Sequence, residues 1–141
     1  MSRHQVVAGI LVDDGAVLLA LRSADRRWFP GVWDLPGGHV EPGEAPRDAL
    51  VRELAEELGV TAEVPAEPAA HVTGDDYDVA VYRVDRWAGT PRNVASDEHD
   101  EVRFVTPDDA RGLLLADSHL LPVVERVLAG GAGGGVRALV E

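Results

Sequence analysis

The sequence contains no cysteine, so it has neither disulfides nor thiol chemistry, and this absence is compatible with a reducing compartment. Long apolar runs are also missing: residues 1–20 hold only short hydrophobic runs, which Asp13, Asp14 and Gly15 interrupt. Such runs provide neither the core of a secretory signal nor a membrane span. We therefore expect a cytoplasmic protein with no membrane partner.

Positive charge is scarce as well. Thirteen lysines and arginines stand against 25 aspartates and glutamates, which gives a formal net charge of -12. The long-range field of such a chain repels nucleic acids and anionic membranes, so we expect no nucleic-acid polymer as a partner. A small polyanionic substrate would need metal cations as intermediaries.

What is present indicates one globular domain. The chain has 141 residues, of which 45% are hydrophobic and 27% charged, enough to bury a core. We expect a domain over residues 1–128 and a flexible glycine-rich tail over residues 129–141. The sequence leaves open whether the protein is a monomer or a homodimer.

The predicted elements alternate between strands and helices. Strands are expected at 5–12, 16–22, 77–87 and 101–105, and helices from Pro46 to Gly59, from Thr106, and from Asp117 to about residue 128. This order predicts the α/β class, with helices layered on a sheet. The run at 75–78 and His71 are assigned to a loop and a strand, with no chemistry expected there.

The helix after Pro46 has a core-facing stripe. At about 100° per residue, Leu50, Leu54 and Leu58 fall on one face. Gly59 ends the helix as a left-handed cap, whereas Ala45 is a poor cap at its start.

Three glutamates, Glu53, Glu56 and Glu57, occupy the arc beside those leucines. Like charges one turn apart destabilise a helix, so their grouping is reasonable where a cation binds. Hard oxygen ligands suit Mg²⁺, with Mn²⁺ as a substitute. The competing interpretation is a solvated acidic helix face.

The surrounding pattern favours the metal interpretation. A glycine, five residues, a glutamate, seven residues and then R-E-aliphatic-x-E-E-x-G-aliphatic are all present, at Gly38, Glu44, Arg52, Glu53, Leu54, Glu56, Glu57, Gly59 and Val60. This pattern resembles the complete Nudix box, and WDLPGG before it resembles the MutT-like branch. The resemblance implies the Nudix fold, an α/β/α sandwich with a mixed central sheet and a loop-helix-loop catalytic box.

The resemblance also implies roles for the box residues. Glu53, Glu56 and Glu57 correspond to metal ligands, and one of them, left open, activates the attacking water. Arg52 and Glu44 correspond to a supporting ion pair, and Gly38 to a backbone carbonyl that faces the metal. Gly37 and Gly59 are structural.

Candidates outside the box are less specific. Arg22 corresponds to a phosphate-contacting arginine, with a solvated strand end as the alternative. Asp34 or Leu35 is expected to line the nucleotide pocket. Asp117 either reads a base edge or caps the last helix, and the cap is slightly favoured.

An additional glutamate is expected before or within the strand at 101–105. Glu101 aligns best as a further metal ligand or catalytic base, with Glu98 as the competitor and a surface cluster as the alternative.

The implied activity is Mg²⁺-dependent hydrolysis of a nucleoside triphosphate to the monophosphate and pyrophosphate, with an oxidised purine nucleotide such as 8-oxo-dGTP as one possible substrate. One alternative is a pyrophosphatase of ADP-ribose, a nucleotide sugar or a dinucleotide. Another is a noncatalytic nucleotide-sensing domain, against which the intact box counts.

Overall fold

A computed structural model describes residues 3–25 and 30–130. Its strands are β1 (His4–Asp13), β2 (Ala16–Arg22), β3 (Trp33–Asp34), β4 (Gly37–His39), β5 (Thr61–Ala62), β6 (Ala70–Thr73), β7 (Tyr77–Val84), β8 (Trp87–Ala88) and β9 (His99–Val105). Its helices are α1 (Pro46–Leu58), α2 (Pro107–Ala110) and α3 (Leu120–Gly130). No helix among the described residues is long and apolar enough to cross a membrane.

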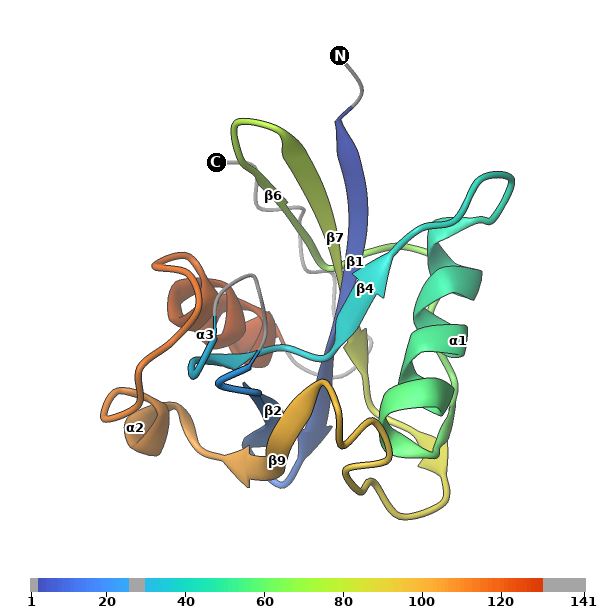
Figure 1. Ribbon diagram of the computed structural model, residues 1–141. Coiled ribbons are helices and arrows are strands. Elements are labelled where there is room, and N and C mark those ends of the chain that lie inside the picture. The colour runs from blue at the N-terminus through green and yellow to red at the C-terminus, as the bar shows by residue number, and fades with distance from the viewer. Residues whose placement is uncertain (1–2, 26–29, 131–141) are drawn as a thin grey trace.

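Seven strands form a mixed sheet with the order β3-β2-β1-β7-β6, in which β4 also pairs with β1 and β9 with β2. Among the strands of the described residues, β1 and β7 are the one pair that runs parallel. Helix α1 lies on one side of the strands and α2 and α3 lie on the other (Figure 1), which confirms the expected α/β/α layers.

Strands β1 and β2 separate beyond their shared turn, and the space between them is called the fork. The two strands pair only beside their turn, at Val12↔Val17 and Asp13↔Ala16. Further from the turn, β4 takes the place beside β1, and β3 takes the place beside β2. The connection from β3 to β4 therefore crosses the fork, where the amide of Gly9 donates to the carbonyl of Pro36 at 2.9 Å.

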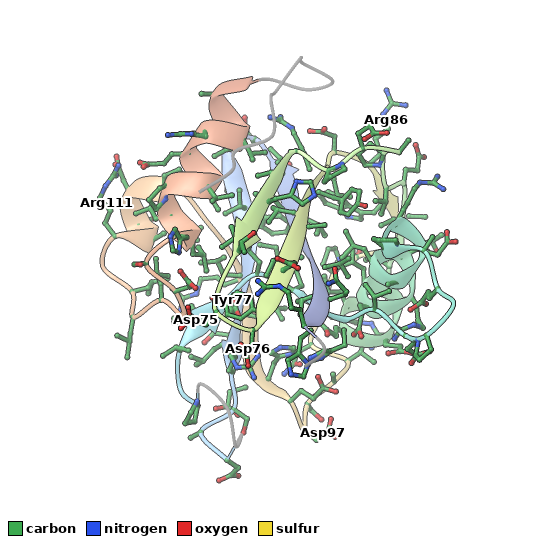
Figure 2. All side chains as sticks on the ribbon, turned by 90° about the horizontal axis from the view of Figure 1, so that it is seen from above. Asp75, Asp76, Tyr77, Arg86, Asp97 and Arg111 are labelled. Atoms are coloured by element: carbon green, nitrogen blue, oxygen red, sulfur yellow. The ribbon has the colours of Figure 1, made fainter. Side chains whose placement is uncertain are left out.

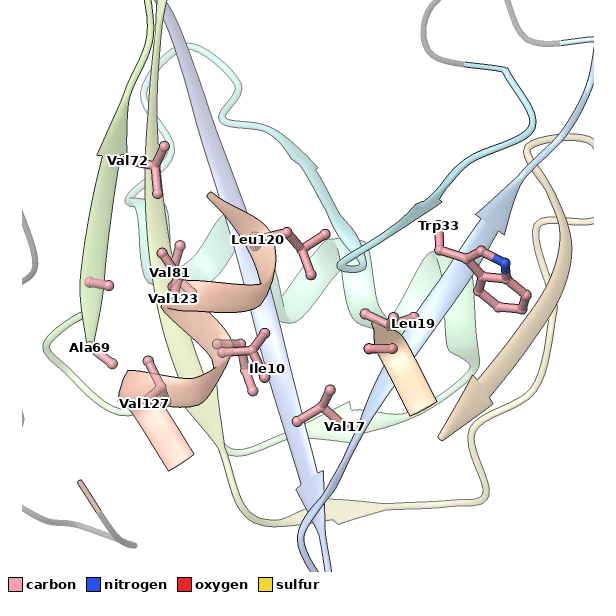
Figure 3. Packing of buried hydrophobic residues seen from close by; sticks show 14 of the residues in the cluster. Ile10, Val17, Leu19, Trp33, Ala69, Val72, Val81, Leu120, Val123 and Val127 are labelled. Carbon is pink, nitrogen blue, oxygen red and sulfur yellow. The ribbon is translucent and has the colours of Figure 1, made fainter. Parts of the chain in front are cut away.

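Each face of the sheet has its own hydrophobic core. The first core packs the sheet against α3 and includes Ile10, Leu19, Trp33, Val81 and Val123 (Figure 3). The second core lies under α1, where Leu50, Leu54 and Leu58 are fully buried, as the helical stripe predicts. Both cores exclude water from the central strands, beside which Gly37 and Gly38 lie in β4.

Several element boundaries differ from those expected. Helix α2 has four residues, although Thr106 caps it as predicted by accepting from the amide of Asp109 at 3.2 Å. Helix α3 begins three residues after Asp117 and continues to Gly130, so residues 129–130 belong to it rather than to the tail. Residues 131–141 lie outside the described part. The sequence pattern also missed the strands of two to four residues, which are too short to show a periodicity.

Candidate active site

Two consecutive glycines allow the chain to pass between strand β1 and helix α1. A Cβ atom on Gly37 would stand 2.0 Å from the carbonyl oxygen of Val7, which belongs to the backbone of β1. A Cβ atom on Gly38 would stand 2.3 Å from Oε2 of Glu53. Side chains at these positions would fill the space that the backbone of β1 and a carboxylate of α1 occupy.

Arg52 clamps the helix to the loop that precedes it. Its Nε donates to Glu44 Oε2 at 2.9 Å and its Nη2 donates to Glu44 Oε1 at 3.0 Å, a bidentate pair. This hydrogen bonding lowers the pKa of Glu44 to about 2. Nη2 also donates to the carbonyl of His39 at 3.1 Å. The expected ion pair is therefore present, and it fixes the loop from His39 to Glu44 against α1.

Glu57 is a buried carboxyl group, and no cation among the residues that the structure describes is recorded as acting on it. The residue is 3% exposed, and its Oε1 accepts from the amide of Gly37 at 3.2 Å. Burial, a side-chain hydrogen bond with Glu53 and the charges of Glu53 and Glu98 raise the pKa of Glu57 to about 9. At neutral pH the pair of Glu57 and Glu53 therefore retains one proton. A positive charge bound beside them would allow both groups to ionise.

This donor set suits a divalent cation. Within residues 3–25 and 30–130, no three carboxylate or imidazole groups are already gathered around one point. Glu56, for example, has a 59% exposed side chain and an Oε1 3.4 Å from Nη1 of Arg52. The carboxyl groups of Glu53 and Glu57 are nevertheless in contact, and the backbone of Gly38 lies against Glu53. Carboxylate and backbone oxygens are the ligands that Mg²⁺ and Mn²⁺ prefer.

The position of Glu101 does not agree with a place among these carboxylates. Glu101 pairs with Leu21 across the sheet, so its side chain lies on the face of the first core, away from α1. There it forms an ion pair with Arg103 at 3.0 Å. We correct the expected placement: Glu98, the competitor, is the residue whose charge acts on Glu57.

A bulge and a fixed loop explain this difference. The register of β2 and β9 shifts between Leu21 and Arg22, so simple alternation does not extend from Glu101 back to Glu98. The loop before β9 is attached to the end of α1, because the amides of Arg92 and Val94 donate to the carbonyls of Leu58 and Glu57 at 3.1 and 3.0 Å. Together they bring Glu98 to the glutamate helix.

A second polar cluster lies on the α3 side of the fork. Leu115 forms a bridge with Trp33, so that the segment before α3 runs beside β3 and brings Asp117 close to Asp34. Burial raises the pKa of Asp34 to about 6, with the charge of Asp117 adding to the rise and that of Arg22 opposing it. The structure thus gathers three of the predicted substrate-binding residues, Arg22, Asp34 and Asp117.

Leu35 and Asp117 have additional structural contacts. The side chain of Leu35 packs against the first core, and its amide donates to Asp34 Oδ1 at 2.8 Å. Asp117 Oδ1 accepts from the amide of His119 at 2.7 Å, which forms an Asx turn before α3. Because α3 begins at Leu120, Asp117 does not occupy the N-cap position of that helix. Its Oδ2 accepts from the hydroxyl of Tyr77 at 3.2 Å.

Tyr77 is the residue of this cluster that sequence reasoning missed. Alternation along β7 could have indicated its position: Val79 and Val81 face the first core, so Tyr77 lies on the same side of the strand. Figure 2 shows Asp75, Asp76 and Tyr77 together at the end of the β6–β7 hairpin.

Comparison with known proteins agrees with this geometry. The NUDIX domain model matches residues 2–127, and the chain belongs to the Nudix family. Within that family it is a MutT-like Nudix hydrolase.

Relatives and solved structures match over most of the chain. The CTP pyrophosphohydrolase of Escherichia coli (strain K12) is 37% identical over 132 residues, which cover 92% of this chain and 94% of that protein. The MutT Nudix hydrolase of Burkholderia pseudomallei superposes with a TM-score of 0.77 at 30% identity, covering 89% of this chain and 97% of that one. A nucleoside triphosphatase NudI of Enterobacter sp. (strain 638) is 46% identical, over 47% of each chain.

Proposed function

We propose that this protein is a Mg²⁺-dependent pyrophosphohydrolase that cleaves a nucleoside triphosphate to the monophosphate and pyrophosphate. The observation that carries the proposal is the buried pair of Glu57 and Glu53 against Gly37 and Gly38. A protein with a net charge of -12 keeps two carboxyl groups in contact where a polyanion has to bind. A divalent cation reconciles these charges.

The residues of the chain divide the work of such a reaction. Glu53, Glu56, Glu57 and Glu98 would hold Mg²⁺, and the backbone of Gly38 leaves the close approach open. Bound there, the metal would neutralise phosphate charge and lower the pKa of a water molecule. Arg52 and Glu44 keep the loop and the helix in register, so that the carboxylates keep their positions during turnover. Which glutamate accepts the proton of the attacking water stays open.

For the substrate, a cytidine nucleotide is the first candidate. Its support is the likeness to the CTP pyrophosphohydrolase, which extends over nearly the whole of both chains. Oxidised purine nucleotides are the second candidate, and their support is the likeness to MutT structures at 30% identity. Asp34 and Asp117 are the candidate base contacts in both cases, because carboxyl groups bond to base edges.

The test is a hydrolysis panel with product identification. Purified protein is incubated with Mg²⁺ and, in turn, canonical and oxidised nucleoside triphosphates, ADP-ribose, dinucleotides and nucleotide sugars. Pyrophosphate and a monophosphate from one triphosphate are expected. Glu57→Gln should lower kcat/KM by at least about a hundredfold. The control is Glu63→Gln, at an exposed residue directly after β5, which should leave kcat/KM unchanged.

Other outcomes would contradict the proposal. Turnover of ADP-ribose or a nucleotide sugar alone would move the substrate to another class of diphosphate. Tight binding of one panel member without cleavage, in Mg²⁺ or Mn²⁺, would indicate a nucleotide-sensing domain instead.

A further inference from the structure

The carboxylate of Asp117 accepts several hydrogen bonds, and their arrangement shows where a further donor could bind. An ionised carboxylate accepts at about four lone-pair positions, two on each oxygen. Oδ1 receives the amide of His119 at 2.7 Å and lies 2.8 Å from Nδ1 of the same residue. Oδ2 receives the hydroxyl of Tyr77 at 3.2 Å. Contacts with the described residues therefore leave one acceptor position on Oδ2, and the Asp117 side chain as a whole is 36% exposed.

Tyr77 itself is held from several sides. The amide of Gly74 donates to the carbonyl of Tyr77 at 2.9 Å, which closes the turn between β6 and β7. Gly74 leaves room for the ring, since a Cβ atom there would stand 2.3 Å from two of the ring carbons. The guanidinium of Arg3 donates to the carbonyls of Gly74, Asp75 and Tyr77 at 2.7–2.9 Å. The turn is thus fixed to Arg3, the residue before β1, and this holds the ring that carries the hydroxyl.

We propose that Tyr77 is a positioning residue for base recognition: its hydroxyl, with His119, holds Asp117 so that Oδ2 accepts a hydrogen bond from an exocyclic amino group of the nucleobase. This inference rests on the proposed function and specifies its substrate class. An acceptor matches the amino group at C4 of cytosine and disfavours the carbonyl oxygen that uracil carries there. Two acceptors face each other in the uracil case, which leaves both unpaired.

The test compares CTP and UTP, which differ at that group. Wild-type protein is expected to have a KM for CTP roughly tenfold below that for UTP, the value of one hydrogen bond to a charged group. Tyr77→Phe should raise the KM for CTP several-fold, leave kcat within about twofold and leave the KM for UTP unchanged. A general structural defect would instead affect both nucleotides.

Tyr82→Phe provides the matched control. It removes the hydroxyl of the second of the two tyrosines, on the same strand but on the opposite face, in the core under α1. It should leave the preference between CTP and UTP unchanged. Asp117→Asn should reverse the preference, because the amide group can donate to the C4 oxygen of uracil. Thermal unfolding checks that each variant is folded.

Binding of CMP and UMP, measured by calorimetry, separates this inference from the proposed function because it needs no turnover. A preference for CMP that Tyr77→Phe removes would support the inference even if no triphosphate were cleaved. Equal binding of CMP and UMP, or equal effects of Tyr77→Phe on both, would overturn it while leaving the hydrolase proposal intact.

Discussion

Two polar regions lie on opposite sides of the connection between β3 and β4, and they treat their carboxyl groups differently. Beside α1, Glu57 and Glu53 share a hydrogen bond, and Arg52 donates to Glu53. Beside α3, Asp117 accepts from Tyr77 and His119. In the first region the carboxyl groups of Glu53 and Glu57 share a proton, and their full ionisation depends on a cation that binds there. The second is nearly satisfied by the protein itself, which suits a group that selects a ligand rather than one that reacts.

The largest effect should come from the adjacent glycines. Gly38→Ala places a methyl group against the carboxylate of Glu53, a flexible side chain that can move. We expect kcat/KM to fall by about a hundredfold through this displacement, with little change in thermal stability. Gly37→Ala meets the backbone of β1 instead and should destabilise the fold. Unfolding curves and steady-state kinetics of both variants check this, and normal activity of Gly38→Ala would remove Glu53 from the metal site.

Glu98→Gln and Glu101→Gln form a matched pair of variants: Glu98 directly precedes β9, and Glu101 lies within it. Glu98 acts on Glu57, whereas Glu101 pairs with Arg103 on the other face. We expect Glu98→Gln to reduce kcat by roughly 10- to 100-fold and Glu101→Gln to leave it nearly unchanged. The reverse order would restore the original assignment of Glu101.

Arg52→Lys should have a smaller effect. Lysine keeps the charge but loses the bidentate contact with Glu44. We expect the affinity for Mn²⁺ to fall roughly tenfold, as for other groups that orient metal ligands. Titration followed by electron paramagnetic resonance measures it. An unchanged affinity for Mn²⁺ would show that the contact between Arg52 and Glu44 contributes to folding and not to metal binding.

The smallest expected effect is on stability without metal. The pKa of Glu57 rises from 4.5 to about 9, so between these values the folded state binds more protons than the unfolded state. The stabilisation is therefore complete below about pH 4.5 and is lost as the pH rises towards 9. We expect a loss on the order of 1 kcal/mol per pH unit between pH 6 and 8. Urea unfolding in EDTA tests this.

Two controls define that result. Glu57→Gln should flatten the dependence on pH, and saturating Mg²⁺ should do the same for the wild-type protein. A similar slope in the wild type and in Glu57→Gln would show that other groups cause it.

The sequence predicts the region beside α1 better than the one beside α3. The box residues are close together along the chain and helical geometry relates them, so Leu50, Leu54 and Leu58 could be placed from periodicity alone. The Tyr77–Asp117 contact joins residues 40 positions apart, through a strand and a bridge that no local pattern reveals. Glu101 is expected ahead of Glu98 because it aligns best with the family pattern, and such an alignment does not show which face of the sheet a side chain takes. The register shift between β2 and β9 makes that face harder to derive from the sequence.

The connection from Trp33 to His39 links the two regions. Asp34 lies at its end near Asp117, and Gly37 and Gly38 lie at its end near the glutamates. Three to four extended residues span at most roughly 14 Å, a short and nearly inextensible tether. Selection of new substrates in a laboratory evolution experiment should therefore succeed through changes at 77 and 115–119, which leave the tether in place. Insertions within residues 34–38 should abolish turnover for every nucleotide.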